Sequence, residues 1–461
     1  MINKIFIKEV QDQIFSNKMI IVSITIVALF LVNSLVFIKD FSDQTKQYQK
    51  INVKTQDALK NSSGNLWQLT FNTQKLTYPS SPLGFIAEGN KKQLPDGVQI
   101  DFFRISNPEY YQNGDVILPS SMALDWNNIL ILLISFVCIF FSYDTFSGEK
   151  MNGTLKLMMS NPVSRNQLIM GKYLGICFIL FLPFITGVII TVLVLLLSPA
   201  IQLSTYQITG ILYYVFAAIL FISLNVFIGM LISALTSKPI VSLSLVLLVW
   251  LVFSIVVPGV GWIISQKTTP VESLNSINDQ LSAEDRALGR SRWNGTWKTP
   301  TPEVLVNKDH FDKQTEISNR IWNNYRNSLF TQAKSGISVS DFSPFQVFRF
   351  LGEQIADVGF SRYQNFYSQV KNYHMGFKDF VIEKDKADKE SFHLIWSMPY
   401  YTRNFMSLKP VNYEEIPKFE YQNPAFLQKF RGTRWGLLIL LGWNVLLLIG
   451  IFFAFTVYDV R

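Results

Sequence analysis

Few residues in this sequence have the types and spacing that enzymes use. Gly148 and Gly153 have the spacing that begins a phosphate-binding P-loop, but Thr154 and Leu155 follow where that loop needs Lys and Ser or Thr. The pair also follows an apolar run and not a buried strand. The sequence has no H-E-x-x-H zinc motif and no G-x-S-x-G nucleophile elbow. We therefore expect no ATP hydrolysis, metalloprotease or serine hydrolase chemistry from this chain.

The histidines do not form a metal-binding pattern. His310, His374 and His393 are far apart in the sequence. His374 precedes Met375, and such a pair could ligate a soft metal ion, but a lone histidine among aromatic residues is more often structural. We therefore predict no metal site and no cofactor bound by this chain.

The composition is that of a membrane protein. Of the 461 residues, 49% are hydrophobic and only 16% are charged. Six apolar runs are long enough to span a bilayer as helices, and they contain no Asp, Glu, Lys, Arg or His. These runs are residues 19–38, 126–143, 173–197, 208–235, 240–257 and 435–457. We expect an α-helical polytopic membrane protein, and the lack of charge in its spans argues against an ion-coupled carrier.

Some polar residues do fall within the spans. We interpret them mainly as helix-packing contacts, which small and amide side chains favour in membranes. A substrate pathway is the alternative, and its residues would be Asn33, Thr186, Asn225 and Asn444.

The remaining segments alternate between short and long. Residues 1–18 have Ile2, Phe6, Val10 and Ile14 on one helical face, which predicts an interfacial amphipathic helix. Residues 39–125 and 258–434 are polar, and we expect them to form a mixed, mainly helical domain. Cys138 and Cys177 both fall within spans, so packing alone must hold that domain together.

Charge in the short segments sets the expected orientation. Residues 1–18, 144–172, 236–238 and 458–461 hold nine Lys or Arg against five acids, while 198–207 holds no charge. The positive-inside rule then places both termini and residues 144–172 in the cytosol. The two long polar segments would lie outside. The net charge of +8 is spread over loops without a nucleic-acid motif, so we expect no nucleic-acid partner.

Residues 144–172, hereafter the coupling segment, lie between the second and third spans. Met151, Leu155, Met158 and Met159 recur at a helical period. Asn161-Pro162 should end that helix, because proline lacks a backbone N–H group. Ser164 is then placed to cap a second helix that continues into the third span.

The same segment carries a family resemblance. Glu149, Gly153-Thr154-Leu155, Pro162-Val163-Ser164-Arg165 and Gly171-Lys172 resemble the signature of ABC-transporter permeases of the type-2 exporter class. The passage from Ser343-Pro344 to Tyr373 is similar to the extracytoplasmic insertion of a subgroup of that class. The resemblance implies a permease whose coupling segment rests on a separate ATPase subunit, which would bind ATP and Mg²⁺. It also implies a second permease subunit, identical or a sister chain.

The resemblance assigns roles within the coupling segment. Glu149 and Arg165 would make charged contacts with the ATPase, and the Met and Leu stripe would dock in its groove. The alternative is that this stripe packs against the chain's own spans. The full set of expected coupling residues is Glu149, Met151, Gly153, Thr154, Leu155, Met158, Met159, Pro162, Arg165 and Lys172.

Three functions remain open from the sequence. The first is the permease subunit of an ATP-driven exporter in the bacterial inner membrane. The second is a mechanotransmitting or assembly protein that passes ATPase motion to the outer domain, and the large polar segments favour it and leave room for an extracytoplasmic partner protein. The third is a receptor or scaffold without an ATPase.

Overall fold

The computed structural model describes residues 2–89, 94–95, 97–105, 124–160, 163–288, 302–395, 405–423 and 426–457. In this part of the chain, six helices are long and apolar enough to cross a membrane, which confirms the predicted fold class. These spans are Asn17–Ser62 (α2), Trp126–Met151 (α4 to α6), Arg165–Leu197 (α8), Thr205–Leu235 (α9), Pro239–Thr268 (α10 and α11) and Gly432–Thr456 (within α16).

The second and fifth spans are composite. The second consists of α4 (Trp126–Asn128), a π-helical stretch (Ile129–Ile134), α5 (Ser135–Ser142) and α6 (Ser147–Met151). The fifth consists of α10 (Pro239–Leu251), a π-helical stretch (Val252–Val256) and α11 (Val257–Thr268). Pro258 follows the second stretch, and a change of helical hydrogen bonding is a common way to accommodate the N–H group that proline lacks.

The other helices complete the two ends of the molecule. They are α1 (Ile2–Ile14), α3 (Leu66–Phe71), α7 (Thr154–Met159), α12 (Leu274–Leu288), α13 (Pro302–Ser340), α14 (Pro344–Ala356), α15 (Gly359–Lys386) and α16 (Phe426–Val457). A 3₁₀ turn covers Tyr413–Glu415. The sequence also predicts a turn at residues 293–297, which lie outside the described residues.

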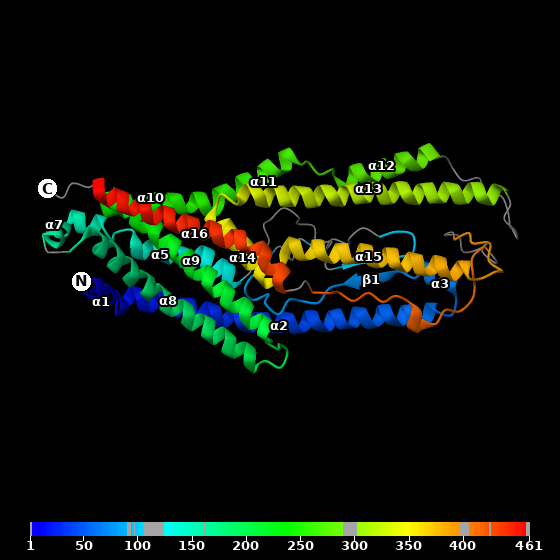
Figure 1. Ribbon diagram of the computed structural model, residues 1–461, viewed down its shortest axis with the longest axis horizontal. Coiled ribbons are helices and arrows are strands. Elements are labelled where there is room, and N and C mark those ends of the chain that lie inside the picture. The colour runs from blue at the N-terminus through cyan, green and yellow to red at the C-terminus, as the bar shows by residue number, and fades with distance from the viewer. Residues whose placement is uncertain are drawn as a thin grey trace.

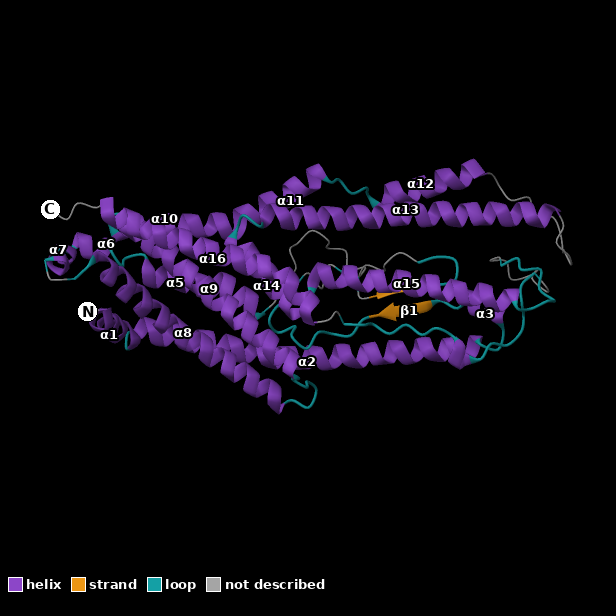
Figure 2. Ribbon diagram, in the orientation of Figure 1, coloured by secondary structure: helices purple, strands orange, loops and turns teal. Residues whose placement is uncertain are grey.

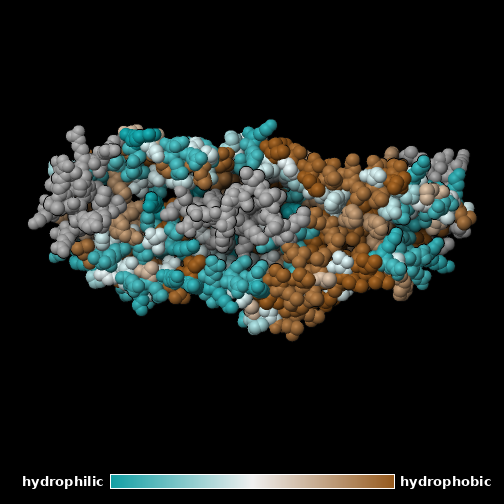
Figure 3. Space-filling model, turned by 180° about the vertical axis from the view of Figure 1, so that it is seen from behind, coloured by the Kyte–Doolittle hydropathy of each residue, from teal (hydrophilic) through white to brown (hydrophobic). Residues whose placement is uncertain are grey.

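The molecule is elongated, with the apolar helices gathered in one half (Figure 1). The start of α1, the α7 helix and the end of α16 lie together at one end. The described parts of residues 39–105 and 269–423, hereafter the polar domain, form the other half, with α14 at the junction between the two halves. Figure 3 shows apolar side chains over the half that contains the membrane-spanning helices. Polar side chains lie at both ends of the molecule, as a bilayer requires.

The first span extends far beyond the stretch predicted from hydropathy. The sequence predicts a span that ends at residue 38, but α2 continues without a break to Ser62. Residues 39–63 contain neither Gly nor Pro, so nothing interrupts the helix. The polar part packs against the sheet and against α3, where Leu59 is buried. At about 1.5 Å per residue, this part projects roughly 36 Å.

A small sheet lies between α2 and α15 (Figure 2). Strands β1 (Gln74–Thr77) and β2 (Gly97–Ile100) are antiparallel, with Gln74 opposite Ile100. A Cβ atom on Gly97 would lie 2.5 Å from the Leu76 carbonyl oxygen, so the strands can approach only at a glycine. The sequence predicts short strands between Gly97 and Ile105, and β2 lies within that range.

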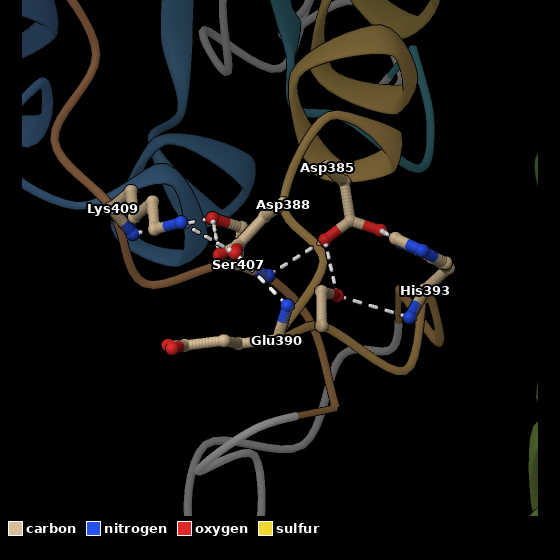
Figure 4. A network of polar contacts seen from close by, with 7 residues as sticks. Asp385, Asp388, Glu390, His393, Ser407 and Lys409 are labelled. Carbon is tan, nitrogen blue, oxygen red and sulfur yellow. Dashed lines mark hydrogen bonds and ion pairs between the residues drawn. The ribbon is translucent and has the colours of Figure 1, made fainter.

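A polar network connects the end of α15 to residues 391–409 in the polar domain (Figure 4). Asp385, at the end of α15, accepts hydrogen bonds from the Ser407 backbone N–H at 2.6 Å and the Ser391 hydroxyl at 2.8 Å. His393 Nδ1 lies 3.1 Å from the same carboxylate. The Ser391 hydroxyl donates to Asp385 and accepts from the His393 backbone N–H, so the imidazole is not placed as its base. The network is therefore a structural cross-link and not a catalytic triad.

A second carboxylate reinforces this cross-link. Asp388 accepts a hydrogen bond from the Ser407 hydroxyl at 2.7 Å and pairs with Lys409 Nζ at 2.7 Å. The hydrogen bonds from Lys409 and Ser407 lower the pKa of Asp388 to about 2. Such bonds hold the returning chain to α15 without a disulfide.

The junction between the two halves centres on the start of the second span. Trp126 is fully buried, and its ring contacts Phe30 of α2, Phe85 and Tyr214 of α9. The Trp126 backbone N–H donates to the Phe85 carbonyl at 3.2 Å. One end of the second span is thus packed against both the membrane helices and the polar domain.

Asn127 adds directional bonds to the same junction. Its Nδ2 donates to the Arg349 carbonyl of α14 at 2.8 Å, and its Oδ1 accepts from the Tyr214 hydroxyl at 2.9 Å. The side chain lies against Gly352, where a Cβ atom would be 2.2 Å from Oδ1. Glycine is required there because the amide occupies the space of any side chain.

The acid that precedes Trp126 is also buried. Asp125 is 4% exposed and accepts bonds from the backbone N–H groups of Asn128 at 2.7 Å and Glu88 at 2.9 Å. Burial raises the pKa of this carboxyl to about 6, although the two N–H groups and Arg349 oppose the rise.

Gly352→Ala should destabilise the junction. The added methyl group displaces Asn127 and breaks its bonds to Tyr214 and Arg349, so we expect a loss of about 2–3 kcal/mol of unfolding free energy. The matched control is Gly376→Ala in α15, where a Cβ atom meets nothing within 4 Å. Thermal unfolding of the purified protein in detergent measures both, and equal midpoints for the two variants would contradict this account.

The buried Asp125 also predicts a pH dependence. Because its folded-state pKa lies above the unfolded value, its contribution to stability is full below about pH 4 and is lost as the pH rises through about 6. The loss is at most about 3 kcal/mol. Asp125→Asn should reduce the difference between unfolding midpoints at pH 4.5 and pH 7, whereas Asp43→Asn, an exposed acid of α2, should not. An unchanged difference in Asp125→Asn would refute the assignment.

Candidate coupling segment

The coupling segment consists of two short helices followed by the start of α8. The sequence predicts one continuous helix through Met151 and Met159, but the structure has α6 and α7 with a break at Asn152 and Gly153. Gly153 adopts a left-handed conformation with φ of +71°, which glycine reaches without steric cost. α7 ends at Met159, and Pro162 lies outside the described residues.

The start of α8 confirms the predicted cap. The Ser164 hydroxyl accepts from the Gln167 backbone N–H at 3.3 Å, and Gln167 Oε1 accepts from the Ser164 backbone N–H at 3.3 Å. This reciprocal pair is a capping box, which satisfies two N–H groups that the helix leaves free.

A buried lysine connects three parts of the segment. Lys172 of α8 is 6% exposed, and its Nζ lies 2.7 Å from Glu149 of α6 and 3.5 Å from Glu9 of α1. Attraction to two carboxylates offsets the cost of burying the ammonium group. The N-terminal helix thereby becomes part of the coupling segment's structure.

Two glycines let α1 approach closely enough for this contact. A Cβ atom on Gly171 would lie 2.8 Å from Ile5 Cβ, and one on Gly175 would lie 2.7 Å from Glu9 Cβ. The spacing of these glycines is the small-x₃-small pattern of close helix pairs in membranes. That spacing indicates a close helix contact at this point of α8, but it does not indicate which helix makes the contact.

The turn before α6 is held by α9. The Ser233 hydroxyl accepts hydrogen bonds from the backbone N–H groups of Phe146 at 2.9 Å and Ser147 at 3.0 Å. Lys150 Nζ donates to the carbonyls of Ala234 and, at 3.1 Å, Thr236 at the C-terminal end of α9. A cation suits that position because the helix end carries partial negative charge.

Arg165 connects the coupling segment to the last helix, α16. Its Nη1 donates to the carbonyls of Phe455 and, at 3.2 Å, Thr456 near the end of α16. The rings of Phe146 and Phe455 pack with centroids 4.4 Å apart. Short contacts therefore connect the coupling segment to α1, α9 and α16 as well as to the two spans that it joins.

The polar residues within the spans have intramolecular partners. Asn33 Nδ2 donates to the Leu124 carbonyl, Asn225 Nδ2 to the Phe221 carbonyl at 2.8 Å, and the exposed Thr186 hydroxyl to the Leu182 carbonyl at 2.8 Å. The Asn225 and Thr186 bonds lie within single helices, so helix packing and a substrate pathway both stay predictions for these residues.

Asn444 belongs to a chain of side chains across three spans. The Tyr173 hydroxyl of α8 lies 2.7 Å from the Ser223 hydroxyl of α9. Ser223 donates to Asn444 Oδ1 of α16 at 2.7 Å. The sequence marked Asn444 but gave no signal for its partners, because each lies on a different helix.

Comparison with known proteins identifies the family. A family model described as ABC-2 family transporter protein matches residues 3–460. The chain belongs to this ABC-2 transporter family. It is also similar to a protein of Pseudomonas aeruginosa named "Probable ABC transporter permease protein NosY", with 33% identity over 76 residues. That match covers 16% of this chain and spans about a quarter (27%) of the relative.

As an ABC-2 transporter protein, the chain is a transmembrane permease subunit, and the family implies partnership with an ABC ATPase and a bilayer. The surface of the coupling segment shows which residues are free to meet such a partner. Met151 is 61% exposed, and Gly153 and Thr154 are also exposed. Leu157, which sequence reasoning missed, is 69% exposed.

Other residues expected to face the ATPase point inward in this permease. Leu155 is 1% exposed within the apolar core, and Met158 and Met159 pack partly against that core. Across the break at Gly153 the apolar stripe does not continue on one face, since Met151 is exposed and Leu155 is buried. Glu149 and Arg165 bind other parts of the same chain. The expected alternative, packing against the chain's own spans, thus describes Leu155.

The geometry around Lys172 predicts that replacing Lys172 lowers the free energy of unfolding more than replacing Glu149 does. Lys172→Met leaves two half-buried carboxylates without their cation, so we expect a loss of about 2–3 kcal/mol of unfolding free energy. Glu149→Gln leaves Lys172 paired with Glu9 and should cost about 1 kcal/mol.

Combining the two changes should recover part of the Lys172→Met loss, because one unpaired acid is removed. Unfolding midpoints in detergent measure all three variants, with Lys156→Met at an exposed site as control. A double variant as unstable as the sum of the singles would contradict the proposed contact.

Proposed function

We propose that this chain is the permease subunit of an ATP-driven exporter, and that separate ATPase subunits bind ATP and Mg²⁺ and press on the coupling segment. The observation that carries the proposal is the combination of an exposed apolar tip, at Met151 and Leu157, with buried contacts behind it. A partner's groove can take the tip, since exposed apolar side chains on short helices are common docking elements.

In the proposed mechanism, the contacts behind the tip transmit motion of the coupling segment to the membrane helices. A push on α6 and α7 reaches α8 and α1 through Lys172, α9 through Lys150 and Ser233, and α16 through Arg165. Several of these contacts are buried or half-buried, so the elements move together more readily than they separate. Closure of the ATPases would thereby change access to a site between two permease subunits, identical or sister chains.

The proposed orientation places the coupling segment and both termini in the cytosol. The positive-inside rule supports this, because the short segments at that end hold the excess of Lys and Arg. The polar domain would then be extracytoplasmic, in the inner membrane of a bacterium. Lipid-facing side chains such as Leu193 and Leu248 are exposed on the helices between the two ends.

A second candidate function has its own observation. The start of the second span is bonded to α14 through Asn127, and α2 runs from the membrane into the polar domain. Motion of the coupling segment would therefore move the polar domain even if nothing crossed the bilayer. A mechanotransmitting protein that acts on an extracytoplasmic partner would use this connection.

Replacing both apolar side chains at the tip tests the ATPase contact. Met151→Ser combined with Leu157→Ser should weaken co-purification of the ATPase from mild-detergent membranes by about tenfold or more, since buried apolar contacts dominate such interfaces. Val53→Ser, a 58% exposed apolar side chain in the polar part of α2, is the control.

The same preparations separate the two functions. ATP-dependent movement of solute into inverted vesicles supports export, whereas an ATP-dependent change in proteolysis of the polar domain without solute movement supports mechanotransmission. Undiminished co-purification in the double variant, with the ATPase bound to the unmodified chain, would refute the assigned contact surface.

A further inference from the structure

A cavity lies beside α2 at the end of its apolar stretch, opposite the coupling segment. It has a volume of about 90 Å³ and is bordered by α2, the loop around Ser80 to Glu88, and Asp125. Its polar lining includes Asn33, Asp40, Gln44, Glu88 and Asp125. The space is enough for a small group of several non-hydrogen atoms.

Asn33, which lines this cavity, has an unsatisfied acceptor. The residue is 3% exposed, and its Nδ2 donates to the Leu124 carbonyl. Its Oδ1 has no hydrogen-bond donor within the described part of the chain. A buried carbonyl oxygen without a donor is unfavourable, so this atom favours a ligand that carries an N–H or O–H group.

The rest of the polar lining supplies acceptors and negative charge. Asp40 and Glu88 form no ion pair with the lysines and arginines that the structure describes. Gln44 Oε1 already accepts from Ser80 at 2.6 Å, and both Asp125 oxygens accept backbone N–H groups. Arg349 opposes part of the Asp125 charge from outside the lining. The ligand that complements this lining is a cation with several N–H donors.

A metal ion fits less well than an ammonium group. Among the described residues, no three His, Cys, Asp or Glu side chains are close enough together to hold a metal ion. A primary ammonium group carries three donors in different directions, which matches one amide oxygen and two separate carboxylates. A quaternary ammonium group lacks those donors.

The depth of the cavity indicates a source for this group. Asn33 lies within the apolar part of α2, and Asp40 lies just beyond that part. Val32, Leu35 and Val36, on the same stretch of helix, are 46%, 55% and 49% exposed. Acyl chains can lie along these side chains while a headgroup enters the cavity at the membrane interface.

We propose that this cavity binds a primary ammonium group, of the kind carried by the ethanolamine headgroup of a phospholipid, through Asn33 Oδ1 and the carboxylates of Asp40 and Glu88. This site is separate from the coupling segment and does not depend on the proposed export function. A soluble amine would present the same chemistry, and the experiment distinguishes the two sources.

The test compares phospholipids that differ only in headgroup. Purified full-length chain, delipidated in detergent, is titrated with ethanolamine, choline and glycerol phospholipids of identical acyl chains, and binding is followed by native mass spectrometry. We expect the ethanolamine lipid to bind best. Asp40→Asn combined with Glu88→Gln should weaken that binding about tenfold, from the loss of two charge-assisted hydrogen bonds.

Asp43→Asn is the matched control, because this exposed carboxylate of α2 does not line the cavity. If the double variant does not fold, Asp40→Asn alone serves, since Asp40 is exposed and its replacement leaves the packing intact. Displacement of the lipid by free ethanolamine at similar concentration would support ammonium recognition and assign a soluble source. If free ethanolamine does not displace the lipid, the source of the bound ammonium group is the lipid headgroup.

Two outcomes would overturn the proposal. In the first, the choline lipid binds as tightly as the ethanolamine lipid, or the double variant binds like the unmodified chain. In the second, Mg²⁺ or Ca²⁺ displaces the ethanolamine lipid from the unmodified chain, but neither ion displaces the residual lipid from the double variant. That result would make the cavity a metal site.

Discussion

The arrangement at the coupling end depends on one buried charge. Lys172 has little access to water, so its ammonium group must keep carboxylates beside it, and these come from α1 and from α6. The requirement fixes where α1 crosses α8 and how far α6 can move from it. Gly171 and Gly175 remove the side chains that would otherwise keep α1 away. An electrostatic need thus sets the packing of three helices at one point.

The opposite end of the membrane half depends on shape more than on charge. Trp126 fills a space among rings from α2, α9 and the 81–88 loop, and Asn127 takes the volume that Gly352 leaves open. Ordinary van der Waals packing and two amide hydrogen bonds join α14 to the second span there. The second span therefore has a defined contact at each end, and it is the element through which the two ends can affect each other.

Local signals in the sequence predicted local structure well. Hydropathy alone found the six spans. Ser164 predicted the start of α8, because a capping box needs only four consecutive residues. The long polar part of α2 was missed, since hydropathy reports where a helix leaves the membrane and not where the helix ends. The orientation of Leu155 was missed because it depends on the backbone conformation of Gly153. Glu9 and Lys172 are far apart in the sequence, so no local pattern could pair them.

The uninterrupted α2 helix has a mechanical consequence. A helix without Gly or Pro between the bilayer and Ser62 bends little, so any tilt of its membrane part is carried to its far end. Over about 36 Å, a 10° tilt sweeps that end through roughly 6 Å. Helices also tilt when the hydrocarbon layer thins. A change in the tilt of α2 within the bilayer would therefore displace the far end of the polar domain.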